Sequence, residues 1–288
     1  MNPRSIWSLM LALLLIFGVG ACTKNIDDAE ALYRSGDKDA ALDVVEELME
    51  SEDPGVRRRA IKLAGDIGND RAGRLMVRAL QDPSPDVQKE AVRGLGKNAY
   101  EPGIEPIIDL LPKADPDVLR AAASALGQYG KPGLDALVER YVTPSESGNR
   151  GLYRQVFLQI GAPAAEALIV TLKGKSFFEN RDTFALLEEM QNPRVATLML
   201  PYLENEEVAE QVVEAIGRLG SKAVAPTLES IKGYSTSPDD VRVLELHIRI
   251  LGKLKDNRAI PTLESLATHP DELIRDATDF ALTQVRGF

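Results

Sequence analysis

The sequence predicts an all-α fold in which helix pairs stack into a superhelical α-solenoid. Two observations support this prediction. A short stretch recurs at a fixed period, because Val56, Val87 and Val118 are each 31 residues apart. The copies also begin with Asp or Ser before Pro and end in a late Gly, which are helix start and stop signals. A period of about 20–50 residues is typical of repeat architectures.

The start of each repeat carries residues that begin a helix. Asp53, Ser84, Asp115 and Ser237 are each followed by Pro. An Asp or Ser oxygen can accept hydrogen bonds from the free N–H groups of a first helical turn. Proline loses nothing at the first helical position, because that N–H has no partner inside the helix. We therefore expect these four residues to be N-caps.

The body of each repeat predicts a long helix followed by a shorter one. In the second copy, Val87, Ala91, Val92 and Leu95 recur at helical spacing and predict one buried stripe. Late glycines permit close backbone approach or helix termination; they are Gly65, Gly96, Gly127, Gly161, Gly217 and Gly252. Shorter second helices are expected, for example, over residues 102–111 and 223–231.

The pattern Asp-Pro-x-x-Val-Arg-x-x-Ala-x-x-x-Leu-Gly, followed by a Pro-x-Leu helix, resembles HEAT repeats, which are ARM-type solenoids. It is most similar to the short-period PBS lyase HEAT-like subclass. The match is strong at Asp53, Asp82, Asp115 and Ser237, weaker near Glu206 and His269, and degenerate over residues 145–203. The resemblance implies about seven to eight helix-pair repeats over residues 53–288. Their apolar anchors are Val56, Val87, Val118, Leu152, Val208, Val243 and Ile274, and a further repeat is inferred around residues 178–203.

The first 21 residues resemble a secretory signal. Arg4 precedes an apolar run from Ile6 to Phe17, and small residues follow. Residues 19–22, Val-Gly-Ala-Cys, are similar to a bacterial lipobox, which implies cleavage before Cys22 and lipid on its sulfur. Cys22 is the only cysteine and has no disulfide partner in the chain. The alternative is an uncleaved anchor with an incidental Cys.

A short tether and a helical cap are expected between the signal and the repeats. Residues 22–28 form the lipidated tether. Residues 29–33 and 40–45 predict two amphipathic helices, broken at Ser35-Gly36-Asp37, within a cap over residues 29–52. Thr23, next to the lipidated residue, resembles the outer-membrane choice of a Gram-negative lipoprotein, so we expect the protein at the outer membrane, facing the periplasm.

The charge balance argues against nucleic acid as a partner. The net charge is −10, and removing the signal with Arg4 makes it −11. Nucleic-acid binding calls for a broad basic face. A local exception lies between residues 53 and 80, where seven Lys and Arg face three Asp. Arg57, Arg58, Arg59 and Lys62 suggest a patch facing anionic headgroups. The alternative is a solvated helix face with ion pairs to Glu46, Glu47 and Glu50.

The second helices carry carboxylates at equivalent positions. In HEAT solenoids these helices usually line the concave, partner-binding face, so the resemblance implies an acidic ladder there. Its members are Glu105, Asp109, Asp135, Glu139, Glu166, Glu229 and Glu264, preceded by Arg74 and Arg78 and interrupted by Val170. Such a ladder would suit a basic or amphipathic segment. The alternative is an ordinary polar face of a solenoid.

Catalytic, metal and cofactor sites are not expected. Lys173-Gly174-Lys175-Ser176 lacks the first glycine of a P-loop, because Ile169 stands there and the preceding segment predicts a helix. The two histidines, His247 and His269, lie on different repeats and outside any Cys/His cluster. No His-Glu dipeptide occurs, which argues against the iron-binding hydroxylases among HEAT-like enzymes. No Gly-x-Ser-x-Gly elbow occurs either.

Three irregular stretches and a closing helix complete the chain. We expect loops over residues 143–149, 174–180 and 235–240, and loops in repeat proteins often lie on a binding face. Phe177 and Phe178 in the second loop mark a partner site if exposed, and a filler between imperfect repeats if buried. Residues 271–286 predict a closing cap helix that carries Arg275, Asp276 and Asp279 outward.

The function expected from these patterns is a non-enzymatic scaffold, lipid-anchored in a bacterial envelope, that binds envelope proteins. Two alternatives remain open. A bilin-lyase-like enzyme of the same subclass predicts a large aromatic or apolar pocket. A periplasmic carrier or chaperone predicts exposed apolar patches in place of the ladder.

Overall fold

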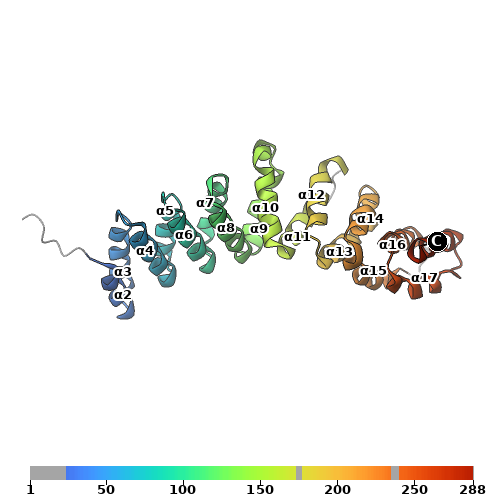
Figure 1. Ribbon diagram of the computed structural model, residues 1–288, viewed down its shortest axis with the longest axis horizontal. Helices are drawn as coiled ribbons and strands as arrows, with labels where there is room; N and C mark the ends of the chain where they lie inside the picture. Colours follow the sequence, from blue (N-terminus) through green and yellow to red (C-terminus); the bar gives the residue numbers. More distant parts are fainter. Residues whose placement is uncertain (1–23, 173–176, 235–239, 288) are drawn as a thin grey trace, which may run out of the picture. The chain divides into compact units, whose positions relative to one another are not determined.

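The computed structural model describes residues 24–172, 177–234 and 240–287, and every regular element in these ranges is a helix (Figure 1). The chain divides into two compact units, one up to Gly94 and one from Leu95. The predicted all-α class is therefore confirmed over the described ranges. The signal, Cys22, the P-loop-like residues 173–176 and Ser237 lie outside them.

The first unit contains the cap and the first repeat. Its helices are α2 (Ile26–Arg34), α3 (Lys38–Leu48), α4 (Pro54–Ile67), α5 (Asp70–Ala79) and the beginning of α6 (Pro85–Lys97). Helix α2 packs on α3, α3 on α4 and α4 on α5, and α2 also contacts α4. The two cap helices and the break at residues 35–37 are thus confirmed.

The second unit continues the pairs. Its α-helices are α7 (Ile104–Leu110), α8 (Pro116–Gln128), α9 (Lys131–Val142), α10 (Arg150–Ile160), α11 (Ala162–Ile169), α12 (Phe177–Glu189), α13 (Pro193–Met199), α14 (Ala209–Arg218), α15 (Val224–Ser230), α16 (Val241–Leu254), α17 (Ile260–Leu266) and α18 (Glu272–Arg286). Short 3-10 helices flank many of them: η1 (Glu101–Gly103), η2 (Leu111–Lys113), η3 (Pro144–Asn149), η4 (Val170–Leu172), η5 (Leu200–Glu204), η6 (Gly220–Ala223), η7 (Ile231–Gly233) and η9 (Asn257–Ala259).

Contacts between repeats place the helices of this unit in two layers. The first helices of the pairs, α8, α10, α12, α14, α16 and α18, each contact the next in that order. The second helices α7, α9, α11, α13 and α15 do the same. The core of this unit lies between the layers, and its anchors Val118, Val208, Val243 and Ile274 are buried, as is Val87 in the first unit. Val56 and Leu152 are only half-buried. This arrangement is the stacked helix-pair solenoid that the period predicts.

Asp53 and Asp115 cap their helices as predicted, and Gly96 allows the close approach expected of a late glycine. The Asp53 side chain accepts a hydrogen bond from the Gly55 N–H at 2.7 Å, and Asp115 accepts one from Asp117 at 2.9 Å. Before α6, the Asp82 carboxylate accepts the Ser84 N–H at 2.8 Å. A Cβ atom on Gly96 would lie 2.7 Å from the Ala125 Cβ, so α6 and α8 can meet there only without a side chain.

Two of the expected loops are helical instead. Residues 144–149 form η3, because a 3-10 helix can satisfy local backbone groups where the α-pattern is broken. The prediction of a loop over residues 174–180 is wrong from Phe177 onward, since α12 begins at that residue. The inferred repeat around residues 178–203 is confirmed by α12, α13 and η5. The helix expected over residues 271–286 is confirmed as α18, and the Asp271 side chain caps it.

Candidate interaction surface

The seven carboxylates of the acidic ladder all lie on second helices of the second unit and are all exposed. Glu105 and Asp109 lie on α7, Asp135 and Glu139 on α9, Glu166 on α11, Glu229 on α15 and Glu264 on α17. Their exposure leaves them available to a partner. Whether they bind one stays a prediction.

One arginine is shared by the two carboxylates of α7. Arg140 on α9 donates to Glu105 Oε2 and to Asp109 Oδ1, each at 2.7 Å. These two hydrogen bonds raise the pKa of Arg140 above its usual value. Because one positive charge faces two negative charges, this group retains a surplus charge of −1.

Most other members of the ladder are paired with a cation of the chain. Asp135 pairs with Lys131, Glu166 with Arg194, Glu229 with Lys232 and Glu264 with Arg286. Glu139 has no ion pair within the described residues. Exposed pairs are worth about 0–1 kcal/mol each, so a partner's cations can replace them. The ladder is therefore partly neutralised, with free charge at Glu139 and beside Arg140.

The pattern of buried and exposed residues shows which positions on the second helices are equivalent to one another. Val170, which directly follows α11 and begins η4, holds the position equivalent to Asp109 and Glu139 and leaves 52% of its surface exposed. On α17, Ser265 is the residue equivalent to Glu229, so Glu264 lies one residue before that column. The acidic part of the ladder is consequently densest on α7, α9 and α11.

A groove runs between α9 and α11 within this dense part. It encloses about 370 Å³ and is lined by Gly130, Lys131, Leu134, Asp135, Pro163, Glu166, Ala167 and Val170. Leu134, Ala167 and Val170 make part of its wall apolar, and the two carboxylates belong to the ladder. An aliphatic side chain can therefore enter beside negative charge.

The structure corrects the predicted basic patch at Arg57. This side chain is only 12% exposed and forms a two-pronged ion pair with Asp82, at 2.7 and 2.9 Å. It also donates to the backbone carbonyl oxygens of Ser51 and Glu52. Although burial favours a higher pKa for Asp82, hydrogen bonds from Arg57 and Ser84 outweigh it and leave the pKa lowered. Arg57 is therefore a structural clamp, not a membrane-facing residue.

The other cations of the first repeat divide into two groups. On α5, Arg71 pairs with Asp43 and Glu46 of α3, while Arg78 pairs with Glu46 and Glu50. These contacts confirm, for α5, the alternative of ion pairs to the cap helix. Arg58, Arg59 and Lys62 on α4 are exposed and have no ion pair within the described residues.

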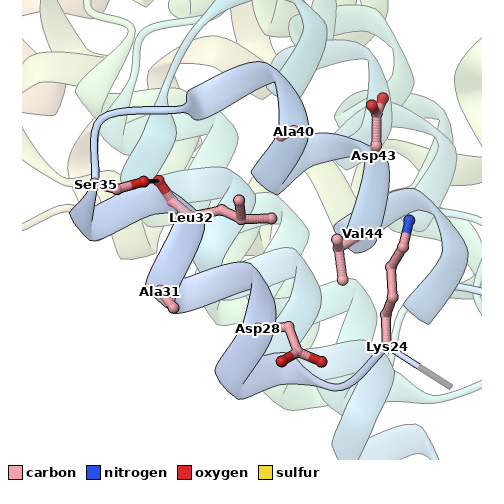
Figure 2. A pocket seen from close by; sticks show the side chains of 8 residues that line it. All are labelled: Lys24, Asp28, Ala31, Leu32, Ser35, Ala40, Asp43 and Val44. Carbon is pink, nitrogen blue, oxygen red and sulfur yellow. Dashed lines mark hydrogen bonds between the residues drawn. The ribbon is translucent and has the colours of Figure 1, made fainter. Parts of the chain in front are cut away.

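A second groove lies in the cap, between α2 and α3, and encloses about 580 Å³. Figure 2 shows Leu32 on α2 and Val44 on α3 at this groove, with Lys24 and Asp28 nearby. The Ser35 hydroxyl donates to the Leu32 carbonyl oxygen at 2.8 Å and closes the end of α2. Lys24 and Asp28, which line this groove, belong to the predicted tether over residues 22–28.

A buried Ser–His contact was not predicted from the sequence. His247 is fully buried, and its Nδ1 lies 2.8 Å from the Val243 carbonyl oxygen. A carbonyl only accepts, so Nδ1 carries the proton and Nε2 accepts the Ser230 hydroxyl at 2.9 Å. Burial lowers the pKa of His247. The centroid of the Tyr234 ring lies 5.0 Å from the centroid of the His247 ring. With no carboxylate on Nδ1, this contact is a packing hydrogen bond between α15 and α16.

Neither a metal-ligand cluster nor a membrane-spanning helix occurs among the described residues. Within them, no three His, Cys, Asp or Glu side chains gather closely enough to hold a metal ion. None of the described helices combines the length and apolar character needed to cross a bilayer.

The comparison with protein families agrees with the helix pairs. The family model for HEAT repeats matches residues 74–155 and 198–283, more than half of the chain. No curated protein matches the chain by sequence. A structure of human deoxyhypusine hydroxylase with glycerol is similar at 17% identity, covers 90% of this chain and 100% of its own, and has a TM-score of 0.36. The structure of an engineered protein has 17% sequence identity and a TM-score of 0.32, and the match covers 92% of this chain and 82% of that one. The structure of Kap121p has 11% identity and a TM-score of 0.39, and the match covers 90% of this chain and 35% of that one.

Proposed function

Because the chain belongs to the HEAT repeat family, we propose that it is a non-enzymatic scaffold that binds another protein through the acidic ladder. The observation that supports this most directly is the exposure of all seven carboxylates on second helices. Their surplus charge, at Glu139 and beside Arg140, favours a basic or amphipathic partner segment.

We further propose that the scaffold is a lipoprotein of a bacterial envelope, anchored through Cys22 at the outer membrane and facing the periplasm. The support is the sequence alone: Arg4, the apolar run and the lipobox-like residues 19–22. Several acyl chains would hold the chain stably, since each buried CH₂ contributes about 0.8 kcal/mol. Anchoring raises the effective concentration of the ladder for envelope proteins. Membership of the PBS lyase HEAT-like subclass is part of the same proposal.

Site-specific crosslinking in cells tests the scaffold. A photo-reactive amino acid is placed at Val170, beside the groove, in the full-length chain. The same reporter is then combined with Asp109→Lys/Glu139→Lys. The matched control carries Asp276→Lys/Asp279→Lys, an equal change in charge on the exposed face of α18. We expect one or two envelope proteins to crosslink, to be lost with the ladder variant and to persist with the control.

Other outcomes reject parts of the proposal. An unchanged set of crosslinked proteins in the ladder variant would reduce the ladder to a solvated face. A broad set of unfolded chains captured equally by all variants would favour the carrier alternative.

The anchor is tested separately. Cells are fed an alkyne fatty acid, and the full-length protein is compared with Cys22→Ala by labelling and by membrane fractionation. We expect label and membrane association in the first and neither in the second. Equal labelling of the two proteins would reject lipidation at Cys22 and leave the scaffold proposal standing.

A further inference from the structure

We propose that Arg58, Arg59 and Lys62 on α4, together with Arg93 on α6, lie against anionic phospholipid headgroups. These four residues form the basic face. The inference rests on the anchor proposed at Cys22, and it adds the orientation in which the first unit meets the membrane.

The four side chains are exposed, and within the described residues none has an ion pair. This separates them from most cations of the first repeat, which are held by carboxylates of the unit: Arg57 by Asp82, Arg71 by Asp43 and Glu46, Arg74 by Asp70, and Arg78 by Glu46 and Glu50. The basic face is thus charge that no ion pair within the described residues holds.

Helix geometry brings these residues to one side of the first unit. At about 100° per residue, positions 58, 59 and 62 of α4 fall within a sector of roughly 100°. Arg93 follows Lys62 by 31 residues, so it holds the same position in the next repeat. The two helices lie close together, because a Cβ on Gly65 would be 3.3 Å from the Gly94 Cα.

Few carboxylates oppose the basic face. Asp86 at the start of α6 is paired with Lys89 at 2.7 Å, and it also interacts electrostatically with Arg58. Glu90 on α6 is half-buried, and Asp66 follows Lys62 by one turn at the end of α4. Four cations therefore face two further carboxylates, so the face stays positive on a chain of net charge −10. Anionic headgroups are attracted to such a juxtamembrane cluster.

The anchor keeps this face near the bilayer. Three residues lie between Cys22 and Ile26, where α2 begins, so the four Cα-to-Cα steps of the tether span at most about 14 Å. Helix α2 contacts α4, and the Tyr33 hydroxyl donates to the Asp66 carbonyl oxygen at 3.1 Å. Proximity to the anchor favours a lipid surface over a nucleic acid or an acidic protein as the ligand.

Covalent footprinting tests the orientation. Cys22 is the only cysteine, so its thiol in the chain from residue 22 to residue 288 can be coupled to a maleimide lipid. The coupled chain keeps every residue that the structure describes. Vesicles contain phosphatidylcholine alone or with phosphatidylglycerol. Arginines are modified with phenylglyoxal and lysines with acetic anhydride, and rates are read by mass spectrometry.

We expect each residue of the basic face to react about fivefold more slowly on the anionic vesicles, which is the effect of a leaflet's surface potential on one nearby cation. High salt should remove this protection. Lys113 and Lys222, exposed in the second unit, should react equally on both vesicles. Equal rates for the basic face on both vesicles would overturn the proposal, as would protection of the two control lysines instead.

Charge reversal gives a second measurement, with Arg93 as the reporter. We expect Arg58→Glu/Arg59→Glu/Lys62→Glu to abolish the protection of Arg93. The matched variant Lys113→Glu/Lys222→Glu/Lys255→Glu has the same net charge and should retain it. Protection of Arg93 in both variants would overturn the proposal. Because the coupling is chemical, the result does not depend on whether cells lipidate Cys22.

Discussion

Adding one methyl group at Gly96 should weaken the packing of α6 on α8. The new Cβ would lie 2.7 Å from the Ala125 Cβ and 2.8 Å from the Ala125 Cα. Carbon atoms in good contact are about 3.5–4.0 Å apart. The shortfall is therefore about 0.7 Å. Because the opposing atoms are fixed to the backbone, the helices themselves must separate.

The size of the effect follows from two opposing contributions. Overpacking of this kind costs about 1–3 kcal/mol. Ala is favoured over Gly inside a helix by about 0.5–1 kcal/mol. Gly96→Ala should therefore lower the free energy of unfolding by about 1–2 kcal/mol. Gly151→Ala is the matched control, because a Cβ on Gly151 in α10 meets no atom within 4 Å. It should be neutral or stabilising by up to about 1 kcal/mol.

Urea denaturation followed by circular dichroism measures both variants in the chain from residue 22 to residue 288. Hydrogen exchange then localises the change, and we expect faster exchange in α6 and α8 for Gly96→Ala. Equal midpoints for Gly96→Ala and the wild type would refute the argument from close approach. A loss of stability in Gly151→Ala equal to that in Gly96→Ala would refute it too.

Three further predictions concern buried polar contacts. Because burial lowers the pKa of His247, the unfolded chain binds more protons than the folded chain below about pH 6.5. The free energy of unfolding should therefore fall by up to about 1.4 kcal/mol for each pH unit below that value. Denaturation curves of His247→Gln at several pH values should lack this dependence. Arg57→Ala should cost about 2–3 kcal/mol in the same assay, because Asp82 loses a charged partner, and Arg57→Lys should recover part of it. Tyr129→Phe should cost about 1 kcal/mol by calorimetry, since its hydroxyl donates to the Tyr100 carbonyl oxygen at 2.9 Å, and no change would contradict this.

The features that sequence predicted well are local in the chain. Asp53 and Asp115 cap helices because the N–H groups that they accept lie two residues away. The close approach at Gly96 is one of the two roles expected of a glycine that recurs at the same place in most copies. Each of these depends only on the residue type and the helix period, which is why no knowledge of the neighbouring helix was needed.

Contacts between helices were harder to predict. In the sequence, Arg57, Arg58 and Arg59 form one basic run, but a rotation of about 100° per residue sends the first toward Asp82. The signal that could have revealed this is an Arg directly after the apolar anchor, which recurs at Arg275. There the guanidinium donates to the His269 and Pro270 carbonyl oxygens, just as Arg57 donates to the loop before α4.

The ladder and its cations show the same limit. The column of carboxylates could be aligned from the repeat period, but the bridge from Arg140 back to α7 could not. That contact needs the separation of α7 and α9 and the rotamer of a long side chain. The contact between Ser230 and His247 likewise joins two helices across residues 235–239, and nothing in their spacing indicates it.

The ion pairs of the ladder bear on how a partner would be held. Replacing an exposed internal pair by an equivalent pair with a partner changes the free energy little, because each is worth about 0–1 kcal/mol. Only Glu139 and the surplus charge beside Arg140 offer a new pair without breaking an old one. Charge of this kind speeds association and fixes orientation more than it adds affinity. Affinity must then come from apolar burial, and the groove beside Val170 is where the dense part of the ladder provides it.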